Sequence, residues 1–289
     1  MSAIATSRTR PPGARPGLLE FGRIPWWAII IIATGLALTY AILANQTYHE
    51  TFNYLVTGVV VTLRIAFVAY LLATIIGLIT GLARTSKNPV LFTISTLYVE
   101  TARGIPLIVL MLYVAFVIIP AGVSLLKAIG TWGLSLGLEP LQGALTSLST
   151  LSIRQINTEM RGIFALAIGY GAFEAEIFRA GIQSISRGQM EAARSLGMTY
   201  PQAMRYVILP QAIRRVLPPL GNDFIACLKD SSLLTVLAVN ELTQLGRLRR
   251  ASTFRVFETF NVVTYLYLAM TMLLSAVVRF IEGKMHIEE

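Results

Sequence analysis

Charged residues are scarce in this sequence, and the shortage excludes a soluble globular domain. Only 13% of the 289 residues are charged, whereas 55% are hydrophobic. Soluble domains carry about a quarter charged residues. A chain of this length cannot bury so much apolar surface in one aqueous core, so we expect lipid to surround most of it.

Cysteine and histidine are nearly absent, which excludes several kinds of site. Cys227 is the single cysteine, so the chain forms no internal disulfide and no multi-cysteine metal centre. His49 and His286 are too few for a His-rich site, and we expect no metal ion. The sequence also lacks the phosphate-binding pattern G-x-x-x-x-G-K followed by Ser or Thr, so it has no ATP site of its own.

Enzyme signatures are missing as well. The sequence contains no H-E-x-x-H, no G-x-S-x-G and no Asp-rich metal cluster. Glu174 and Glu176 are close in the chain, but on a helix they point to different faces and make a poor acid–base pair. A membrane enzyme is therefore disfavoured.

Basic residues outnumber acidic ones, giving a net charge of +9. In an integral membrane protein such an excess is typical of the cytoplasmic face. No recognition-helix or RNA-binding pattern is present, so we expect no nucleic-acid partner.

The N-terminal region predicts a tail followed by a membrane anchor. Residues 1–23 are rich in Pro, Gly and Arg, which is typical of a flexible basic tail. Residues 24–44 carry no charge, and Trp26 and Trp27 near their start suit a membrane interface. The rival interpretation is a signal peptide, whose apolar core spans about 7–15 residues before a small-residue cleavage site. We favour an uncleaved transmembrane helix.

Five further spans follow, which predicts an all-α integral membrane protein with six transmembrane helices. They are residues 56–83, 104–120, 162–184, 211–238 and 259–281. If the helices alternate, most flanking basic residues fall on one side, which predicts that both termini are cytoplasmic. The exception is RLRR (247–250) with Arg255, which falls outside and meets either an acidic partner or water.

Glycines stand out in two places. Residues 121–161 are mildly apolar and glycine-dotted, and they predict an outer loop with an interfacial amphipathic piece. In the second span, Gly77 and Gly81 form a G-x-x-x-G pattern, which permits close packing against another helix.

The stretch from 188 to 210 is polar and compact, unlike the apolar runs around it. Met190, Ala193 and Leu196 are spaced three apart, which predicts a short helix over residues 188–197. Gly197 suits a left-handed stop after this helix, and Met198 then lies over Ala193, as in a Schellman end.

A second short helix is predicted to start at once. Thr199 and Gln202 form a T-x-x-Q capping box, and Pro210 is expected to interrupt the helix. The two helices would form a rigid cytoplasmic elbow. Such an elbow suits docking into another protein, although an ordinary connector between spans has the same local signals.

One motif runs through this elbow. It consists of Glu191, Ala192, Ala193 and Gly197, followed after nine residues by Val207, Ile208, Leu209 and Pro210. It resembles the EAA loop of ABC importer membrane subunits, which reads E-A-A, three residues, G, nine residues and I-x-L-P. Val207 is the only departure. The stretches 98–109, 172–189 and 209–233 resemble the polar amino acid branch of that family, and the similarity spans residues 55–285.

The resemblance implies the permease subunit of an ATP-driven importer in the bacterial cytoplasmic membrane. Two permease subunits, identical or sister, would line the path, and two cytoplasmic ABC ATPases would hold ATP and Mg²⁺. An external solute-binding protein would deliver an amino acid, and this chain would bind no cofactor. The resemblance also implies ATPase contact through Glu191, Ala192, Ala193, Gly197, Leu209 and Pro210. The tail, the 24–44 helix and the 121–161 loop would be additions to a five-helix core.

Ionisable residues inside the spans need a partner or a role, because each costs about 2.5–3.5 kcal/mol on insertion scales. Glu176 and Arg179 are three residues apart and predict a structural pair, with substrate contact as the alternative. Glu174 has no close basic partner on its own face, which makes it a candidate for the substrate path.

The fifth span carries a polar stripe, which suits a bundle interior or a water-filled path. Its members are Asn222, Asp223, Lys229 and Asp230. Lys229 and Asp230 fit a structural network equally well. The prolines at 218 and 219 favour a bent or broken helix.

The charges in these spans suit a zwitterionic amino acid. Glu174 and Asp223 are the candidates for the ammonium group, with Asn222 beside them. Arg64 in the second span either meets a carboxylate or snorkels outward.

The main alternative is a stand-alone secondary transporter or channel for small polar solutes. Buried carboxylates serve such a carrier equally well. The docking elbow distinguishes the two functions, because a self-sufficient carrier does not require one.

Overall fold

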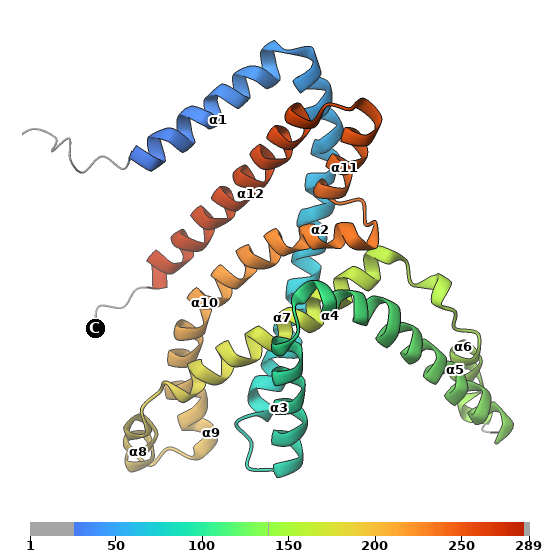
Figure 1. Cartoon of the computed structure of the whole chain (residues 1–289). Coiled ribbons are helices and arrows are strands. Elements are labelled where there is room, and N and C mark those ends of the chain that lie inside the picture. Colours follow the sequence, from blue (N-terminus) through green and yellow to red (C-terminus); the bar gives the residue numbers. More distant parts are fainter. Residues whose placement is uncertain (1–25, 138, 286–289) are drawn as a thin grey trace, which may run out of the picture.

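The computed structural model describes residues 26–137 and 139–285, and within them every regular element is helical (Figure 1). This confirms the predicted all-α class. The predicted tail, residues 1–23, lies outside the described residues.

The α-helices follow one another along the chain, with short 3₁₀ and π segments between them. The α-helices are α1 (Trp26–Ala44), α2 (Gln46–Ala83), α3 (Pro89–Gly104), α4 (Leu107–Tyr113), α5 (Ile119–Ser135), α6 (Gln142–Ser149), α7 (Thr158–Gln183), α8 (Arg187–Ser195), α9 (Tyr200–Ala203), α10 (Leu209–Asp230), α11 (Leu242–Thr253) and α12 (Val256–Met285). The π segments are Val114–Ile118 and Met204–Ile208, and the 3₁₀ segments are Glu139–Leu141, Ile153–Gln155 and Ser231–Leu237.

Helix α2 is the long central element against which much of the chain packs (Figure 1). It has 38 residues, or about 57 Å at the usual helical rise. A Cβ placed on Gly77 would lie 2.6 Å from the Glu174 Cβ, and one on Gly81 would lie 2.8 Å from the Ala175 carbonyl oxygen. The predicted close packing at these two glycines is therefore confirmed, and α7 is the partner helix.

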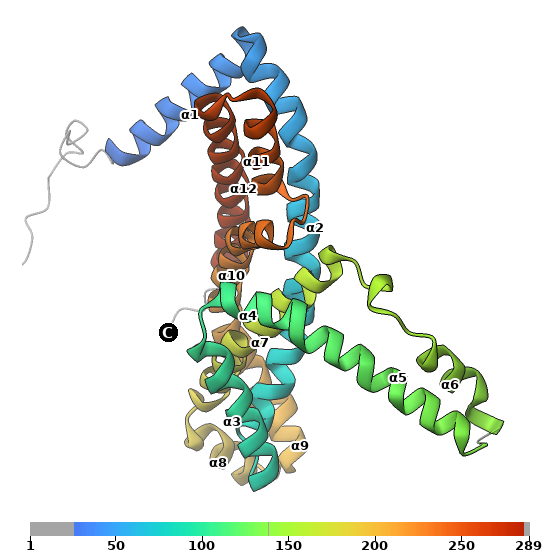
Figure 2. The ribbon, with the colours of Figure 1, turned by 45° about the vertical axis from the view of Figure 1, so that its right-hand side comes forward.

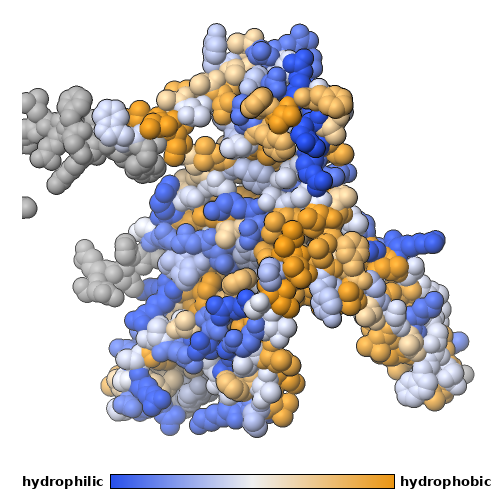
Figure 3. Space-filling view, in the orientation of Figure 1, coloured by the Kyte–Doolittle hydropathy of each residue, from blue (hydrophilic) through white to orange (hydrophobic). Residues whose placement is uncertain are grey.

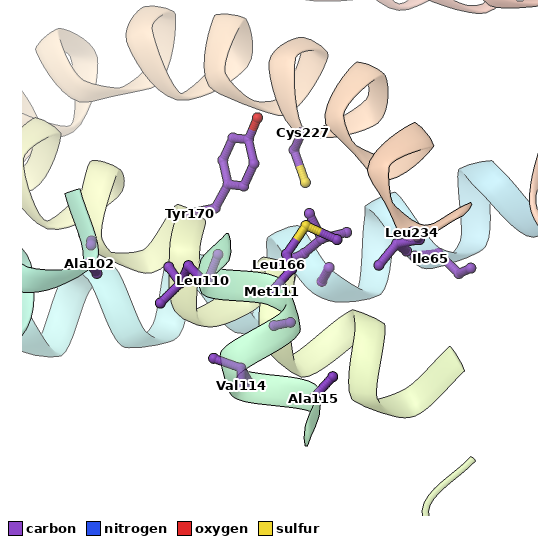
Figure 4. Packing of buried hydrophobic residues seen from close by; sticks show 14 of the residues in the cluster. Ile65, Ala102, Leu110, Met111, Val114, Ala115, Leu166, Tyr170, Cys227 and Leu234 are labelled. Atoms are coloured by element: carbon purple, nitrogen blue, oxygen red, sulfur yellow. The ribbon is translucent and has the colours of Figure 1, made fainter. Parts of the chain in front are cut away.

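Two buried clusters include side chains of this central helix. In the first, Leu110 and Met111 of α4 meet Leu166 of α7 and the buried Cys227 of α10 (Figure 4). The second joins α1, α2, α10, α11 and α12, with Leu55 of α2 fully buried in it. These contacts hold α7 and α10, which carry the candidate site, in fixed positions against α2.

Three helical runs in the described residues are long and apolar enough to cross a membrane. They are Gln46–Ala83, Leu107–Ser135 and Val256–Lys284. Helix α1 contributes a shorter apolar stretch, Ala28–Ala44. The structure supports a helical membrane protein, while the number of six spans stays a prediction.

The predicted third span, 104–120, has different boundaries in the structure. Helix α3 ends at Gly104 because Ile105 is extended, with φ −103° and ψ 136°, as the residue before a proline prefers. Helix α4 starts after Pro106 and continues through the π segment Val114–Ile118 into α5, which ends at Ser135.

Much of the segment 121–161, which predicted an outer loop, is helical. Helices α5 and α6 form an arm that projects from the rest of the molecule (Figures 1 and 2). A Cβ on Gly130 would lie 2.5 Å from the Ser149 amide nitrogen, and Leu145 covers Gly133. In the sequence, these glycines suggest that the helix is broken. In the structure, Gly130 and Gly133 lie within α5 and allow α6 to approach it closely.

The surface is divided by hydropathy. Hydrophilic side chains gather around the end that carries α8 and α9, whereas a hydrophobic patch covers the region of α4 (Figure 3). Exposed side chains of α4 include Ile108, Val109 and Leu112. Lipid or another apolar surface must cover this patch, because soluble monomers seldom expose one of that kind.

Candidate coupling elbow and transport site

The elbow between α7 and α10 begins with helix α8, which ends as the sequence predicts. Gly197 has φ +82°, a left-handed conformation that suits glycine. Its amide donates to the Arg194 carbonyl oxygen at 3.0 Å, and the Met198 amide donates to the Ala193 carbonyl oxygen at 3.2 Å. These two hydrogen bonds are the Schellman pattern, so the predicted helix stop is confirmed.

The second half of the elbow starts at Thr199, whose amide donates to the Gln202 side-chain oxygen at 2.8 Å. This confirms that Gln202 reaches back to the start of the helix. The expectation that Pro210 interrupts the helix is wrong. The π segment Met204–Ile208 leads directly into α10, so the helical backbone continues through Pro210 and accommodates it next to the π segment.

The elbow has its own small core and an exposed outer face. Ala193 and Ala203 are buried, and Met190 and Met204 pack around Ile208. Of the residues predicted to contact an ATPase, Ala193 supports this core, while Glu191, Ala192, Gly197, Leu209 and Pro210 are exposed.

Leu196, at the tip of α8, is 82% exposed. Exposed aromatic side chains, Tyr200 and Tyr206, lie further along the elbow. A rigid knob that presents a large apolar side chain together with aromatic rings has the composition of a protein-binding surface.

Glu174 lies where α7 crosses α2, and its side chain is fully buried. Neither carboxylate oxygen has a hydrogen-bond partner within 3.5 Å in the described part of the chain, and Thr74 of α2 is the neighbouring hydroxyl. Leaving a buried polar group unpaired costs about 1–3 kcal/mol, so its presence calls for a role beyond packing.

The predicted polar stripe on α10 is divided between two faces. Asp223, Cys227 and Asp230 turn toward the interior, whereas Asn222 and Lys229 are exposed. The division follows from helical geometry, because residues 222 and 223 are 100° apart on the helix. Helix α10 itself stays unbroken through the two prolines at 218 and 219.

Asp223 and Asp230 have different surroundings. The Asp223 Oδ2 is buried and has no hydrogen-bond partner among the residues described. Asp230 accepts a hydrogen bond from the Tyr170 hydroxyl at 2.7 Å. Lys229 forms no ion pair with Asp230 in the described structure, so the structural contact of Asp230 is with α7, and Asp223 keeps free polar capacity.

Glu176 binds arginines from three helices. Arg179 reaches its Oε2 at 2.7 Å, which confirms the predicted pair within α7. Arg84 at the end of α2 and Arg103 of α3 reach its Oε1 at 2.5 Å and 3.3 Å. Sequence analysis missed Arg84 and Arg103 as members of this cluster. No local signal identifies them, because the contacts join segments far apart in the chain.

Arg64 on α2 pairs with Glu159, at the start of α7, with 2.6 Å between Nη2 and Oε1. The Arg64 side chain is 59% exposed. In the structure Arg64 therefore contacts a carboxylate of the chain itself, and its predicted place on the substrate path stays a prediction.

A groove of about 440 Å³ lies between α7 and α10. Glu176 lines it from α7, Ser184 from the position directly after that helix, and Arg215 from α10. The rest of the lining is apolar or glycine: Ile177, Ala180, Gly181 and Pro219. Arg215 donates to the Ser184 carbonyl oxygen at 2.6 Å. The volume falls within the range of small-molecule sites, about 300–1,000 Å³. A second hollow of about 290 Å³, beside Leu78 and Phe178, is lined by apolar side chains and does not suit a polar solute.

The basic cluster of α11 and the following Arg255 is partly neutralised. Arg249 pairs with Glu50 at 3.5 Å, and Arg255 lies 3.6 Å from Glu258. Arg247 donates to the Thr235 hydroxyl at 3.1 Å. Within the described residues, no group of three or more His, Cys, Asp and Glu residues is placed to hold a metal ion.

Comparisons with known proteins agree with this geometry. Residues 73–286 match the family model described as "Binding-protein-dependent transport system inner membrane component". The chain is 33% identical over 233 residues to the glutamine transport system permease protein GlnP of Escherichia coli, covering 81% of this chain and 93% of that protein. It is 36% identical over 236 residues to the probable glutamine ABC transporter permease protein GlnM of Bacillus subtilis, covering 82% and 95%.

Solved structures give the same result. A crystal structure of an amino acid ABC transporter with histidines superposes with a TM-score of 0.65 and 32% identity, covering 84% of this chain and 98% of that chain. The inward-facing MetNI methionine ABC transporter has a TM-score of 0.58 at 20% identity and shares the fold.

Proposed function

The chain belongs to the family of binding-protein-dependent transport system inner membrane components, and on that premise we propose that it translocates amino acids with energy from a separate ATPase. It is the permease subunit of an ABC importer, and its relatives include permeases named for glutamine. The chain contains no phosphate-binding loop, so the energy must enter through contact with another protein.

The observation that carries the coupling proposal is the capped elbow α8–α9. Its turn is held by backbone hydrogen bonds around Gly197, and Leu196 at its tip is 82% exposed. A rigid helix that presents an apolar side chain transmits displacement from an ATPase better than a loose loop does. Two ATPases, a second permease subunit and an external solute-binding protein complete the proposed complex, with both termini of this chain in the cytoplasm.

Crosslinking tests the coupling proposal directly. The only native cysteine of this chain, Cys227, is buried, so a cysteine introduced at an exposed position is the only accessible thiol that this chain contributes. We expect Leu196→Cys to crosslink to the ATPase in the assembled complex. Ser252→Cys on α11 is the matched control, because it is exposed and lies toward the opposite end of the molecule, and it should not crosslink. Failure of Leu196→Cys in a complex that hydrolyses ATP contradicts the proposal.

For the solute, the supporting observation is the pair of partnerless carboxylates, Glu174 and Asp223. A cationic ammonium group is the natural ligand for such oxygens. The test is uptake by vesicles that contain the whole complex, with Glu174→Gln and Asp223→Asn compared with wild type. Unchanged affinity and rate for both variants remove these residues from the path.

The competing function is a secondary transporter that works alone. Solute uptake by the purified chain in ATP-free liposomes supports that function. Uptake that requires the ATPase and ATP supports ours.

A further inference from the structure

The turn between α11 and α12 carries an aromatic side chain in a backbone conformation that bulky residues seldom adopt. Phe254, which directly follows α11, has φ +58° and ψ 13°. Glycine or asparagine usually occupies such a left-handed position at the end of a helix. Packing does not compensate for this strain, because Phe254 is 87% exposed. A strained residue that gains nothing from packing is typical of a functional position.

The side chains around Phe254 have the composition of a protein-binding surface. Arg247 and Arg250 are three residues apart and share the exposed face of α11. Phe257, in the first turn of α12, is 80% exposed. Hydrophilic and hydrophobic side chains both face outward at this end of the molecule (Figure 3). Arginine and aromatic residues are enriched at protein–protein interfaces and dominate their binding energy.

This surface keeps an excess of positive charge. The carboxylates of Glu50 and Glu258 are already paired with Arg249 and Arg255. Within the residues that the structure describes, Arg250 forms no ion pair. A second copy of this chain is a poor partner, because a two-fold interface would set the same basic surface against itself. The charge suits a different protein that presents an acidic surface.

The α11–α12 turn lies at the end of the molecule opposite the α8–α9 elbow (Figures 1 and 2). The start of α2 lies at the same end, since Arg255 donates to the Thr47 hydroxyl at 3.1 Å. Helix α2 is about 57 Å long at the usual helical rise, whereas the hydrocarbon layer is about 30 Å thick. With the elbow at a cytoplasmic ATPase, as proposed, the α11–α12 turn therefore reaches the external solution.

We propose that Arg250 and Phe254 dock the external solute-binding protein, through an acidic surface that contains an apolar recess for the Phe254 ring. Charges at the rim of an interface speed association, and a buried aromatic anchor slows dissociation. The inference rests on the proposed function and names the surface on which the solute is delivered. The headgroups of anionic lipids carry the same negative charge, and the experiment distinguishes them from a protein.

The test measures docking to the complete complex in phosphatidylcholine nanodiscs. The probe is the purified solute-binding protein that supports amino acid uptake by the wild-type complex. Arg250→Gln should slow association by about 3- to 10-fold and reduce its dependence on salt. Phe254→Gly should weaken binding by about 10-fold or more. The melting temperature of the Phe254→Gly complex should stay the same or rise, because glycine adopts φ +58° without strain.

Two variants are matched controls. Ala238→Gly changes a second non-glycine residue with a positive φ, +55°. Lys284→Gln removes an exposed cation from the far end of α12. Both should dock as wild type does. Normal docking in either Arg250→Gln or Phe254→Gly overturns the inference, and so does a loss in Phe254→Gly that comes with a lower melting temperature, since the ring is then structural.

Nanodiscs that contain phosphatidylglycerol test the lipid alternative. If Arg250→Gln docks normally and lowers the melting temperature only in these nanodiscs, the surface binds lipid headgroups and the inference is overturned. If no solute-binding protein supports uptake by the wild-type complex, the proposed function fails and the inference fails with it. Uptake that depends on a binding protein which docks equally well to wild type and to both variants removes the inference alone.

Discussion

Gly77 of α2 lies so close to Glu174 of α7 that a Cβ on the glycine would be 2.6 Å from the Glu174 Cβ. This contact sets the distance between the two helices and also encloses the partnerless carboxylate. The packing of α2 against α7 and the surroundings of the Glu174 carboxylate therefore both depend on the absence of a side chain at Gly77.

Replacing Gly77 by alanine should separate α2 from α7 and destabilise the protein by about 1–3 kcal/mol, the usual cost of overpacking. The measurement is thermal unfolding of the purified chain in detergent. Gly35→Ala on α1 is the control, because nothing lies within 4 Å of a Cβ at that position. Equal melting temperatures for the two variants contradict the proposed role of this contact.

Gly197→Ala should weaken coupling more than it weakens folding. Alanine at φ +82° costs about 1–2 kcal/mol, and relief of that strain would open the turn between α8 and α9. We expect transport per ATP hydrolysed to fall several-fold in an assembled complex. Gly197→Pro and Glu191→Lys should have a larger effect of the same kind.

The control for this prediction lies in the same helix. Gly188 is in the first turn of α8, where an added Cβ meets only the Ser186 hydroxyl, at 3.9 Å, and Gly188→Ala should keep normal coupling. Full coupling in Gly197→Ala, with insertion and assembly confirmed, would show that the shape of the turn does not transmit the power stroke.

The elbow was predictable because its determinants are local. Gly197 and the Thr199–Gln202 pair act within a few residues, so the chain order reveals them. The π segment before Pro210 was not predictable, since the sequence shows the proline but not whether the helix ends there or continues past it through a π segment.

Other features depend on contacts between distant segments. The ion pair of Arg84 with Glu176 joins residues 92 positions apart, and no sequence pattern in a single chain encodes it. The α5–α6 arm was missed for the same reason, because the function of Gly130 as a contact point appears only when Ser149 of α6 lies against it. The sequence shows that Glu174 lacks a basic partner on its own helix face. Its burial against Gly77 of α2 appears only in the structure.

Glu176→Gln should destabilise the junction of α2, α3 and α7. The variant loses the charge that three arginines share, and we expect a cost of about 1–3 kcal/mol, since the Glu176 side chain is only 20% exposed. Glu100→Gln is the matched control. Its carboxylate contacts Arg84 at 3.2 Å but is 64% exposed, so the loss should stay within about 0–1 kcal/mol. Comparable losses in thermal unfolding for the two variants would refute the central position of Glu176.

Glu241 should be the more costly of two helix caps to remove. It is fully buried, and its carboxylate accepts from the amides of Thr243 and Gln244, each at 2.7 Å, and from the Tyr267 hydroxyl at 2.9 Å. Glu241→Ala leaves the two amides unpaired and leaves Tyr267 with only the Thr243 hydroxyl as a partner, so α11 should lose about 1–3 kcal/mol of protection in hydrogen exchange.

Asn88, which caps α3, is the comparison for this prediction. It is exposed, and its side chain accepts from the Val90 amide at 2.9 Å. Asn88→Ala should cost about 1 kcal/mol, because water replaces the lost partner there. In Glu241→Ala no water reaches the two unpaired amides without opening the contact between α11 and α12. The loss of hydrogen-exchange protection in Glu241→Ala should therefore spread to the amides of α12. In Asn88→Ala the loss of protection should stay within the first turn of α3. Protection of α12 that is unchanged in Glu241→Ala would show that the carboxylate caps α11 alone and does not join the two helices.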